Sequence, residues 1–262
     1  MTRALVVGGA GFIGTAACKE LMRRGVETIA AGRKDRPYGT FTSYVAFDCA
    51  DKAQLRRAVD STEPDVVLDL AGGRTAAMDF AGDRHVLVTC EQVESKATVV
   101  TAPAVLGPGD PTLRIAAYIQ RVADGGPLLV PEETYERQLG IAWNKDVGYA
   151  CALACDLRKD TNGKSYMVGF EGVSLRDLIE GIARALGVPA RVHAIPQSEM
   201  PEGASPYAAA EYSIEQARRD LGFEPSALED ALADTLAWHR VAKPSHPGYA
   251  NRAAELAIAG AR

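Results

Sequence analysis

The sequence of 262 residues contains no apolar run that approaches the roughly 18 residues of a membrane-spanning helix. It also lacks a basic N-terminal stretch followed by a short apolar segment, which is the pattern of a secretory signal peptide. The chain instead enters a strand-like run almost at once. These absences predict a cytoplasmic protein that has no membrane partner.

Cysteine is scarce, and its spacing follows no metal-binding pattern. An odd number of cysteines without zinc-type spacing favours small buried hydrophobic side chains in a reducing compartment. We therefore expect no disulfide framework and no metal site. The five cysteines are Cys18, Cys49, Cys90, Cys151 and Cys155.

The chain has neither a strong charge of one sign nor a shortage of apolar residues. The formal net charge is −5 with scattered Lys and Arg, so we expect no nucleic-acid partner. Apolar residues make up 47% and charged residues 24%, as in ordinary globular proteins. The length allows one α/β domain, or a large nucleotide-binding half with a small second lobe.

Short apolar runs alternate with helical patterns through the first part of the chain. The alternation predicts an α/β fold with right-handed crossovers, namely a Rossmann-like doubly wound parallel sheet. We expect residues 1–110 to form the Rossmann part. Residues 111–262 are expected to form a small C-terminal substrate lobe, mixed with the last strand or strands of the sheet and the C-terminal helices. The expected strands are 4–9, 26–33, 44–49, 65–73, 85–90 and 98–110, and the helices between them are 15–25 and 52–64.

Two connections in this pattern are very short. About a dozen residues separate Gly73 from the run 85–90, which leaves room for at most two or three helical turns. Only EQVESKA separates Cys90 from the next expected strand with its exit loop, 98–110. Two successive crossovers are therefore expected to be truncated. His85, just before its strand, is expected to be exposed.

The remaining sequence is mainly helical in pattern. Ser174 precedes an apolar helical repeat and is expected to be its N-cap. The tail 246–262 is weakly helical. The expected helices are 112–126, 144–159, 173–187, 213–225 and 227–242, and the expected strands are 165–170 and 190–196.

A glycine-rich turn follows the first strand. Gly9, Gly11 and Gly14 fit G-x-G-x-x-G between a strand and a helix. Such glycines permit a tight turn and let the backbone approach a pyrophosphate, which sits at the positive end of a helix starting near Phe12. The sequence therefore predicts a dinucleotide site. The alternative is a turn that serves only the close packing of helix on strand.

The end of the second strand, AAGRKDR, bears on the choice of dinucleotide. Gly32 occupies the place where NAD enzymes usually carry an acid for the ribose 2′-hydroxyl. Arg33 follows, with Lys34 and Arg36 close by, and a guanidinium can grip a 2′-phosphate bidentately. NADP(H) is therefore favoured over NAD(H), unless these residues form only a solvated loop. Asp48 either accepts a hydrogen bond from the adenine amino group or forms a turn.

With this loop, Arg33, FDCAD and LDLAGG in place, the chain resembles the extended short-chain dehydrogenase/reductases, the NAD-dependent epimerase/dehydratase-like family. The family's own pattern, G-x-x-G-x-x-G, is met by Gly8, Gly11 and Gly14. APAVLGPGD (102–110) resembles its Pro-containing loop near the nicotinamide. The resemblance, together with the residues above, implies as cofactor-binding residues Gly8, Gly11, Phe12, Ile13, Gly14, Arg33, Lys34, Asp48, Leu70, Ala71, Gly72, Thr89 and Pro103.

The family's catalytic motif is absent from its usual place. Relatives carry Tyr-x-x-x-Lys on the helix between strands five and six, where Tyr handles a proton and Lys lowers the pKa of Tyr. Here Lys96 is the only lysine in place, and Gln92 stands four residues before it. No tyrosine lies between Tyr44 and Tyr118. The chain is thus expected to be an atypical member that lacks the Tyr acid.

Candidates for replacing the lost groups are few. Cys90 is either a thiolate activated by a nearby cation or an inert thiol, and Lys96 either holds the nicotinamide ribose or is simply solvated. Thr89 and Cys90 stand where the family has its hydroxyl residue. In the substrate half, further candidates either line a pocket or only pack in the core. They are Tyr118, Tyr135, Trp143 and Asp146.

The resemblance also bears on assembly. Family dimers commonly pair through the two helices that flank strand five. Both crossovers are truncated here, so we expect that interface to be missing. The protein is then a monomer or a different oligomer, with a more open face beside the cofactor.

Two functions remain open at this point. The first is an NADP(H)-binding oxidoreductase or epimerase-like enzyme acting on a small carbonyl, imine or sugar-like substrate without the usual Tyr acid. The cofactor itself would carry the hydride chemistry. The second is a non-redox or catalytically degenerate dinucleotide-binding protein whose open face binds a partner or a substrate.

Overall fold

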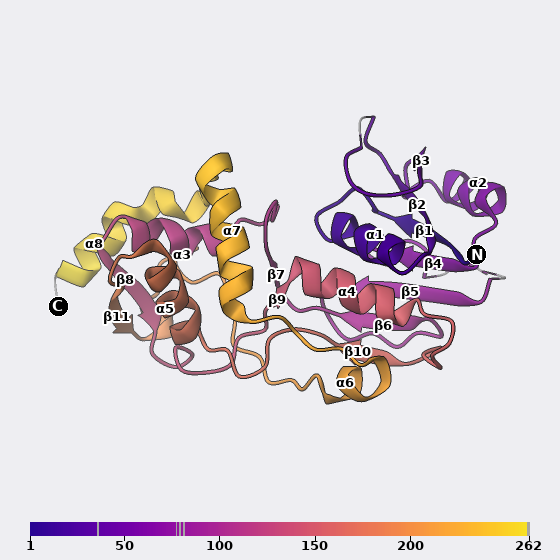
Figure 1. The fold of residues 1–262 in the computed structure, drawn as a ribbon. Helices are drawn as coiled ribbons and strands as arrows, with labels where there is room; N and C mark the ends of the chain where they lie inside the picture. The colour runs from indigo at the N-terminus through magenta and orange to yellow at the C-terminus, as the bar shows by residue number, and fades with distance from the viewer. Residues whose placement is uncertain (36, 77, 79, 81, 261–262) are drawn as a thin grey trace. The chain divides into compact units, whose positions relative to one another are not determined.

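The computed structural model describes residues 1–35, 37–76, 78, 80 and 82–260. Arg36, which the sequence places near Arg33, lies outside the described residues. The chain divides into two compact units (Figure 1). The first boundary between the units falls between Pro103 and Ala104, earlier than the division at residue 110 that the sequence predicted. Unit 1 comprises Met1–Pro103, Asn144–Gly169 and Ser213–Pro225, and unit 2 comprises Ala104–Trp143, Phe170–Tyr212 and Ser226–Arg262.

Unit 1 is built on a parallel sheet of seven strands in the order β10-β6-β5-β4-β1-β2-β3. The order reverses at β1, as in a doubly wound Rossmann-like sheet, and confirms the predicted fold class. Most of these strands are apolar and buried because helices or loops cover both faces. The strands are β1 (Arg3–Val7), β2 (Glu27–Gly32), β3 (Ser43–Ala46), β4 (Val66–Asp69), β5 (Arg84–Thr89), β6 (Thr98–Thr101) and β10 (Ser165–Met167).

Helices α1 (Gly14–Arg23) and α4 (Asn144–Ala154) pack against each other in unit 1 (Figure 1). Small residues allow the close approach, because a Cβ built at Gly148 would lie 2.7 Å from the backbone nitrogen of Ala17. The sequence predicted a helix over 144–159, and the observed helix α4 ends earlier, at Ala154. A short helix, α6 (Glu215–Leu221), packs near β10.

Helix α2 (Lys52–Thr62) belongs to a separate apolar core. Asp51 caps this helix by accepting hydrogen bonds from the backbone N–H groups of Ala53 and Gln54. The core joins α2 to the β1, β2 and β4 half of the sheet. Its buried members are Leu5, Val7, Ile29, Ala31, Phe47, Leu55, Ala58, Val59 and Val67.

Arg84, at the start of β5, ties the sheet to the end of α4. Its guanidinium donates hydrogen bonds to the carbonyl oxygens of Ala154 (3.0 Å) and Lys159 (2.7 Å), and to the hydroxyl of Thr161. Arg84 is 5% exposed. A buried cation thus satisfies acceptors that follow the helix, where no apolar side chain could do so.

The two short connections carry no helix in their described residues. Between β4 and β5, residues 74–76 form a turn, and the residues of this connection that the structure describes include no helical turn. Between β5 and β6, residues 90–97 run without regular structure. The expected truncation of both crossovers therefore holds for the described part of the chain.

Unit 2 contains small sheets and four α-helices among its described residues. Strand β8 (Pro127–Pro131) pairs in parallel with β11 (Arg191–Ile195), and β7 (Val105–Leu106) pairs with β9 (Ala142–Trp143). The sequence did not predict β8 or β9, because each is short and depends on a partner far along the chain. The helices are α3 (Arg114–Ala123), α5 (Leu175–Leu186), α7 (Leu228–Ala242) and α8 (Arg252–Gly260).

The core of unit 2 joins the inner faces of α3, α5 and α7 to the strands β7, β8 and β9. Ser174 caps α5 as predicted, in a reciprocal capping box with Asp177. Tyr118 is fully buried, stacks on Tyr207 and hydrogen-bonds Ser205 (2.9 Å), so it packs rather than lining an open pocket.

The cysteines are all free thiols. Cys18, Cys151 and Cys155 are buried as the sequence predicted, whereas Cys49 is half-buried and Cys90 is exposed. Burial raises the pKa of the Cys18 thiol to about 12. The described residues contain no group of three or more side chains arranged to hold a metal ion, and none of their helices is both long and apolar enough to cross a bilayer.

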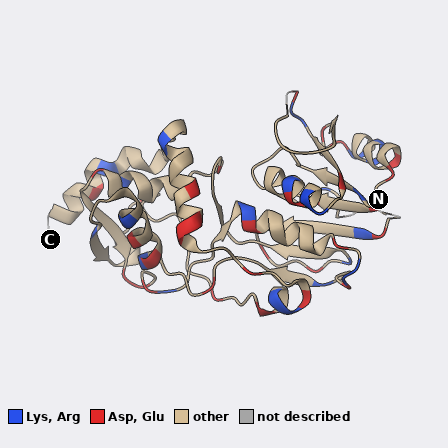
Figure 2. Ribbon diagram, viewed as in Figure 1, with Lys and Arg blue, Asp and Glu red and all other residues tan. Residues whose placement is uncertain are grey.

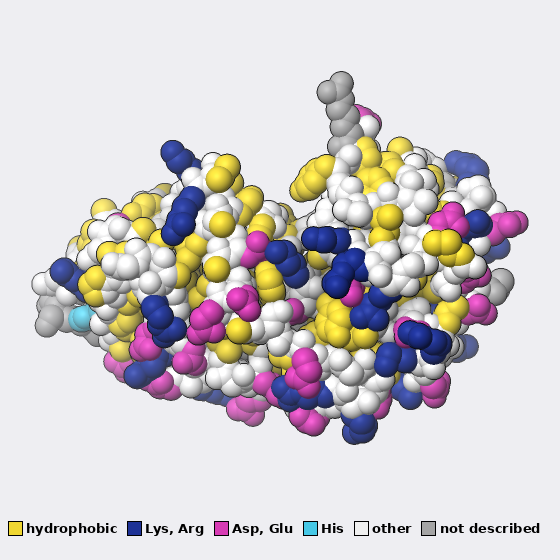
Figure 3. Space-filling view, viewed as in Figure 1, with side chains coloured by type: hydrophobic (Ala, Val, Ile, Leu, Met, Phe, Trp, Pro, Cys, Tyr) yellow, Lys and Arg dark blue, Asp and Glu magenta, His cyan; other side chains and the backbone are white. Residues whose placement is uncertain are grey.

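Charged residues of both signs are interspersed along the ribbon (Figure 2). Basic side chains gather over α1 on the face shown in Figure 3. There Arg23 and Arg24 both pair with Glu20, at 2.9 and 3.1 Å. These cations are therefore partly neutralised within their own helix.

Candidate functional site

The glycine turn between β1 and α1 has a shape that other residues could not adopt. Gly8 has a φ of +84°, and the Gly11 N–H donates to the Gly8 carbonyl (2.9 Å). A Cβ at Gly14 would overlap that same carbonyl, and one at Gly9 would lie 2.8 Å from the Cβ of Ala30. These glycines let the helix start directly against the strand end.

Unpaired backbone donors lie where this turn enters α1. No described residue accepts a hydrogen bond from the backbone N–H groups of Phe12 or Ile13, and Ile13, the N-cap, makes no side-chain cap. The Asn144 side-chain amide donates to the Phe12 carbonyl (3.2 Å) and fixes the turn against α4. Such a helix start offers N–H groups and a positive dipole end to an anion.

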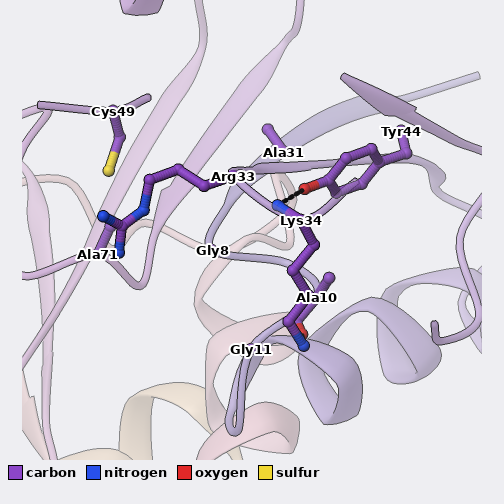
Figure 4. Close-up of a pocket in the computed structure, with 10 residues that line it drawn as sticks. Gly8, Ala10, Gly11, Ala31, Arg33, Lys34, Tyr44, Cys49 and Ala71 are labelled. Atoms are coloured by element: carbon purple, nitrogen blue, oxygen red, sulfur yellow. Dashed lines mark hydrogen bonds between the residues drawn. The ribbon is translucent and has the colours of Figure 1, made fainter. Parts of the chain in front are cut away.

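A cavity of about 470 Å³ opens beside the turn, within the size range of small-molecule and cofactor sites (Figure 4). Five of the predicted cofactor-binding residues line it, and so do five others. The lining residues are Gly8, Ala10, Gly11, Ala31, Gly32, Arg33, Lys34, Tyr44, Cys49 and Ala71. The glycine cradle, the free N–H groups and the two cations together fit the phosphates of a dinucleotide.

The two predicted cations border this cavity in different ways. The exposed Arg33 side chain extends from the end of β2 toward Cys49 and Ala71 (Figure 4). Lys34 instead reaches the glycine turn, where its Nζ donates to the Ala10 carbonyl (2.5 Å). The Lys34 ammonium also stands 4.6 Å from the ring centroid of Tyr38. Lys34 is therefore engaged with the loop, whereas the Arg33 guanidinium is exposed.

Asp48 does not line the cavity. Its carboxylate accepts a hydrogen bond from the Ala50 N–H (3.0 Å), and its own N–H donates to the Gln54 side chain (3.3 Å). The structure thus shows the turn-forming arrangement, which is one of the two alternatives that the sequence left open.

The other predicted cofactor residues lie at the carboxyl edge of the sheet or in the turn. Leu70 donates its N–H to the Val7 carbonyl (2.9 Å), and Gly72 has a φ of +78°. Pro103 follows β6. None of the following residues lines the cavity: Phe12, Ile13, Gly14, Leu70, Gly72, Thr89 and Pro103.

Among the lining residues that the sequence did not predict, Tyr44 and Cys49 are the two whose side chains can hydrogen-bond a ligand. Both come from β3 or the turn after it. Strand β3 pairs in parallel with β2, and this register sets Tyr44 beside Ala30. The expected strand order could have indicated them, because β3 neighbours the end of β2 in a doubly wound sheet.

The predicted catalytic candidates lie after β5. The Thr89 hydroxyl donates to the Glu91 carbonyl (2.7 Å) and lies 3.4 Å from the hydroxyl of Thr101. Cys90 and Lys96 are both exposed, and neither side chain has a hydrogen bond or ion pair with a described residue. The structure therefore brings together the two threonines and does not assemble Cys90 and Lys96 into a cluster.

A buried polar network fastens the connection from β4 to β5. Asp69, fully buried, accepts hydrogen bonds from the N–H groups of Ala71 (2.7 Å) and Thr75 (2.7 Å) and from the Thr75 hydroxyl (2.9 Å). That hydroxyl also lies 2.6 Å from Nε2 of His85. Because the hydroxyl proton goes to Asp69, we assign the Nε2–H donor role to His85.

His85 is half-buried, so the expectation that it is exposed is wrong. It stands opposite Val67 of β4, whose side chain belongs to the apolar core under α2. Burial lowers the pKa of His85, and the negative charge of Asp69 opposes this shift. Within the described part of the connection, a short turn closed by Thr75 thus follows β4.

Comparisons with known proteins agree with this geometry. Residues 4–79 match the sequence profile of the NAD dependent epimerase/dehydratase family. This segment contains the glycine turn and all the residues that line the cavity. The resemblance to that family is thus confirmed for residues 4–79. No curated protein matches the chain by sequence.

Solved structures share the fold over nearly the whole chain. The UDP-glucose 4-epimerase of Thermotoga maritima, solved with UDP-glucose, is 16% identical with a TM-score of 0.70, covering 93% of this chain and 100% of that one. The UDP-glucuronic acid 4-epimerase of Bacillus cereus, in complex with UDP-glucuronic acid and NAD, is 14% identical with a TM-score of 0.68 (92% and 100%). The Thermus thermophilus UDP-glucose 4-epimerase complex with NAD is 20% identical with a TM-score of 0.62 (91% and 99%). These likenesses show a common fold.

Proposed function

We propose that this protein is an NADP(H)-binding enzyme of the epimerase/dehydratase type. It acts on a small carbonyl, imine or sugar-like substrate without the usual tyrosine acid. The observation that carries the proposal is a single cavity that joins the glycine turn to Arg33 and Lys34. The family profile over residues 4–79 supports it.

The pyrophosphate is proposed to lie on the start of α1. There the N–H groups of Phe12 and Ile13 have no acceptor among the described residues. Backbone donors at a helix start hold phosphate oxygens without adding a side chain that would fill the cavity. The proposed cofactor contacts are Gly8, Gly11, Phe12, Ile13, Gly14, Arg33, Lys34, Leu70, Ala71, Gly72, Thr89 and Pro103, with Asp48 through its turn.

NADP(H) is proposed over NAD(H) because of the residues that end β2. Gly32 provides no carboxylate to accept a hydrogen bond from a ribose 2′-hydroxyl. Arg33 is exposed at the cavity edge, and a guanidinium can bind a phosphate through two parallel hydrogen bonds. The same cation offers less to an uncharged 2′-hydroxyl.

The bound nicotinamide would supply the hydride chemistry. We propose that the Tyr acid of the family has been lost, since no tyrosine lies between Tyr44 and Tyr118. Cys90 and Lys96 are the proposed replacements, Cys90 as a thiolate and Lys96 as the residue that holds the nicotinamide ribose. An imine-type substrate, or one with its own acidic group, would need less help with protons.

A second candidate is a dinucleotide-binding protein that performs no hydride transfer. The exposure of Cys90 and Lys96, with no hydrogen-bond or ion-pair partner in the described chain, favours it. The helix-free connections around β5 would then form a face for a partner or substrate. For either candidate we propose a monomer, or an oligomer that does not use the family's helical interface.

The first experiment is direct titration of the full-length protein with NADPH and with NADH, followed by nicotinamide fluorescence and calorimetry. NADPH is expected to bind more tightly. Arg33→Ala should weaken NADPH binding by about tenfold to a hundredfold, because a hydrogen-bonded charge is lost, and should affect NADH much less. Arg56→Ala is the matched control, since Arg56 is an exposed arginine paired with Asp60 on α2. Binding of neither dinucleotide would contradict the proposal.

The second experiment separates the two candidates. NADPH consumption is followed with a panel of small carbonyl and imine compounds, for the natural protein and for Cys90→Ala and Lys96→Ala. Turnover that falls in these variants while NADPH binding persists supports the enzyme. A cofactor-loaded protein that never exchanges hydride with the panel supports the binding protein. In sedimentation, a dimer that is broken by substitutions on β5 would contradict the proposed assembly.

A further inference from the structure

Tyr44 lies beside Gly32, the position at the end of β2 where NAD enzymes usually carry an acidic residue. It lies on β3, opposite Ala30 of β2, and it lines the cavity. A Cβ built at Gly32 would lie 3.4 Å from the Tyr44 hydroxyl oxygen. In NAD enzymes, the acid at the end of this strand binds the ribose 2′-hydroxyl. A phenol hydroxyl therefore occupies the neighbourhood of the missing carboxylate.

The Tyr44 hydroxyl accepts one hydrogen bond and can still donate one. The Lys34 backbone N–H donates to it at 3.0 Å (Figure 4). The Tyr44 ring also packs against Phe41, with 5.9 Å between the two ring centroids. No described residue accepts the hydroxyl's own proton. A hydroxyl donates one hydrogen bond and accepts up to two, so one donor remains for a ligand.

The replacement changes which ligand suits this corner. A carboxylate accepts hydrogen bonds from a ribose hydroxyl and repels a phosphate. A phenol hydroxyl donates to a phosphate oxygen and carries no charge. Lys34 follows the end of β2. Its backbone N–H donates a hydrogen bond to the Tyr44 hydroxyl, and its ammonium donates one to the glycine turn. Lys34 thus links the Tyr44 hydroxyl to the glycine turn.

We propose that Tyr44 is a specificity-determining residue, whose hydroxyl donates a hydrogen bond to the 2′-phosphate of NADP(H). The inference rests on the proposed function, because it requires a dinucleotide in this cavity. It adds a residue from β3 to the basic pair at the end of β2.

Tyr44→Phe tests the proposal, because it removes one oxygen and keeps the ring that packs on Phe41. The dissociation constant of NADPH should rise about tenfold or more, as expected for a lost hydrogen bond to a charged group. That of NADH should change by less than about twofold. The ligands 2′-AMP and 5′-AMP, measured by calorimetry, should reproduce the difference without the nicotinamide half.

Tyr38→Phe is the matched control. Tyr38 lies on the same segment between β2 and β3, is 69% exposed, and meets Lys34 through its ring rather than its hydroxyl. Its substitution should leave both dissociation constants unchanged. Thermal unfolding of all three proteins checks that Tyr44→Phe folds as the natural protein does.

The outcomes distinguish this inference from the proposed function. If the natural protein binds neither dinucleotide, the proposed function and the inference both fall. If the natural protein prefers NADPH and Tyr44→Phe keeps the full preference, only the inference falls. Equal weakening of NADPH and NADH by Tyr44→Phe also overturns it, because Tyr44 would then only support the loop through Lys34. A selective loss for NADPH and 2′-AMP establishes it.

Discussion

The two halves of the sheet in unit 1 are built differently. On the side of β3, β2, β1 and β4, helices cover the strands, and the turn after β1 forms a glycine cradle beside a cavity. On the side of β5 and β6, the described residues of the connections from β4 to β5 and from β5 to β6 hold no helix, and α4 packs on both strands. That half is stabilised instead by Arg84 and by the buried link from Asp69 through Thr75 to His85.

Under the proposed function, one half of the sheet would bind the dinucleotide and the other half would lack the family's groups for handling a proton. Backbone hydrogen bonds to β4 and β6, together with Arg84 and the packing of α4, keep β5 in the sheet although the described residues of the two connections beside it hold no helix. Under the proposed function, this half would also lack the usual scaffold for the family's Tyr and Lys pair. Function resides in the site rather than in the fold, and the two halves can change independently.

The strongest expected effect lies in the helix-covered half. Gly14→Ala would place a Cβ onto the Gly8 carbonyl and 2.7 Å from the Gly9 Cα, both rigid backbone. We expect the turn to shift, NADPH binding to fall more than roughly a hundredfold, and unfolding free energy to drop by about 3 kcal/mol. Titration and urea denaturation measure these effects. Gly260→Ala, where a Cβ meets open space, is the control. An unchanged affinity in Gly14→Ala would show that the glycine turn does not bind the dinucleotide.

Arg84→Ala tests what holds the helix-poor half. It leaves the Ala154 and Lys159 carbonyls and the Thr161 hydroxyl without their buried donor. We expect a loss of about 3 kcal/mol in urea denaturation, with little change in NADPH affinity. Arg158→Ala, whose exposed side chain pairs with Asp156, should cost less than about 1 kcal/mol. Equal costs for the two variants would show that Arg84 does not anchor β5.

Asp69→Asn gives a smaller effect on the same half. The amide nitrogen of Asn cannot accept one of the hydrogen bonds that Ala71 and Thr75 now donate. Stability should fall by about 2 kcal/mol, and amide hydrogen exchange should accelerate between β4 and β5. Asp83→Asn, an exposed position in the same connection, serves as the control. Unchanged exchange in Asp69→Asn would mean that the network does not fasten the turn.

The smallest expected effect is a pH dependence from His85. Burial lowers the pKa of His85 in the folded protein below its unfolded value of about 6.5. The unfolded chain therefore binds the proton more tightly, and unfolding free energy falls as the pH drops through 6.5 toward the folded pKa. Above that window this contribution is constant.

Urea denaturation at pH 8, 6.5 and 5, for the natural protein and for His85→Gln, measures the pH dependence that His85 contributes to the unfolding free energy. The stability of the natural protein relative to the variant should decline on acidification. Burial also lowers the pKa of His239 and of His246, but both proteins share these groups, so their effect cancels in the difference. Parallel profiles for the two proteins would show that His85 does not titrate differently on folding.

Local patterns in the sequence predicted much of the fold. The alternation of strand and helix, the glycine turn, the cap at Ser174 and the short connections around β5 all depend on neighbouring residues. Predicted ends were too long at several places: the run 65–73 shortens to Val66–Asp69, and 98–110 divides into β6 and β7. Loop residues after a strand share its apolar composition, so composition alone does not mark the end.

The site was predicted only in part. Arg33 and Lys34 follow from their place after β2, and both line the cavity. Tyr44 and the link from Asp69 to His85 were missed, because each depends on a partner set by strand register or by a turn ten or more residues away. Cys90 was singled out by its position after β5, and the structure leaves it exposed and outside any cluster.

By itself, the sequence determined a glycine turn at the start of a helix, an absent acid after the second strand and two connections too short for their usual helices. Only the tertiary structure decided that the Tyr44 hydroxyl stands beside Gly32, that Arg84 anchors the end of α4, and that Thr75 joins Asp69 to His85. The physical reason is that turns and periodic patterns are set by neighbouring residues. Hydrogen bonds between distant side chains form only after the sheet has fixed which strands lie side by side.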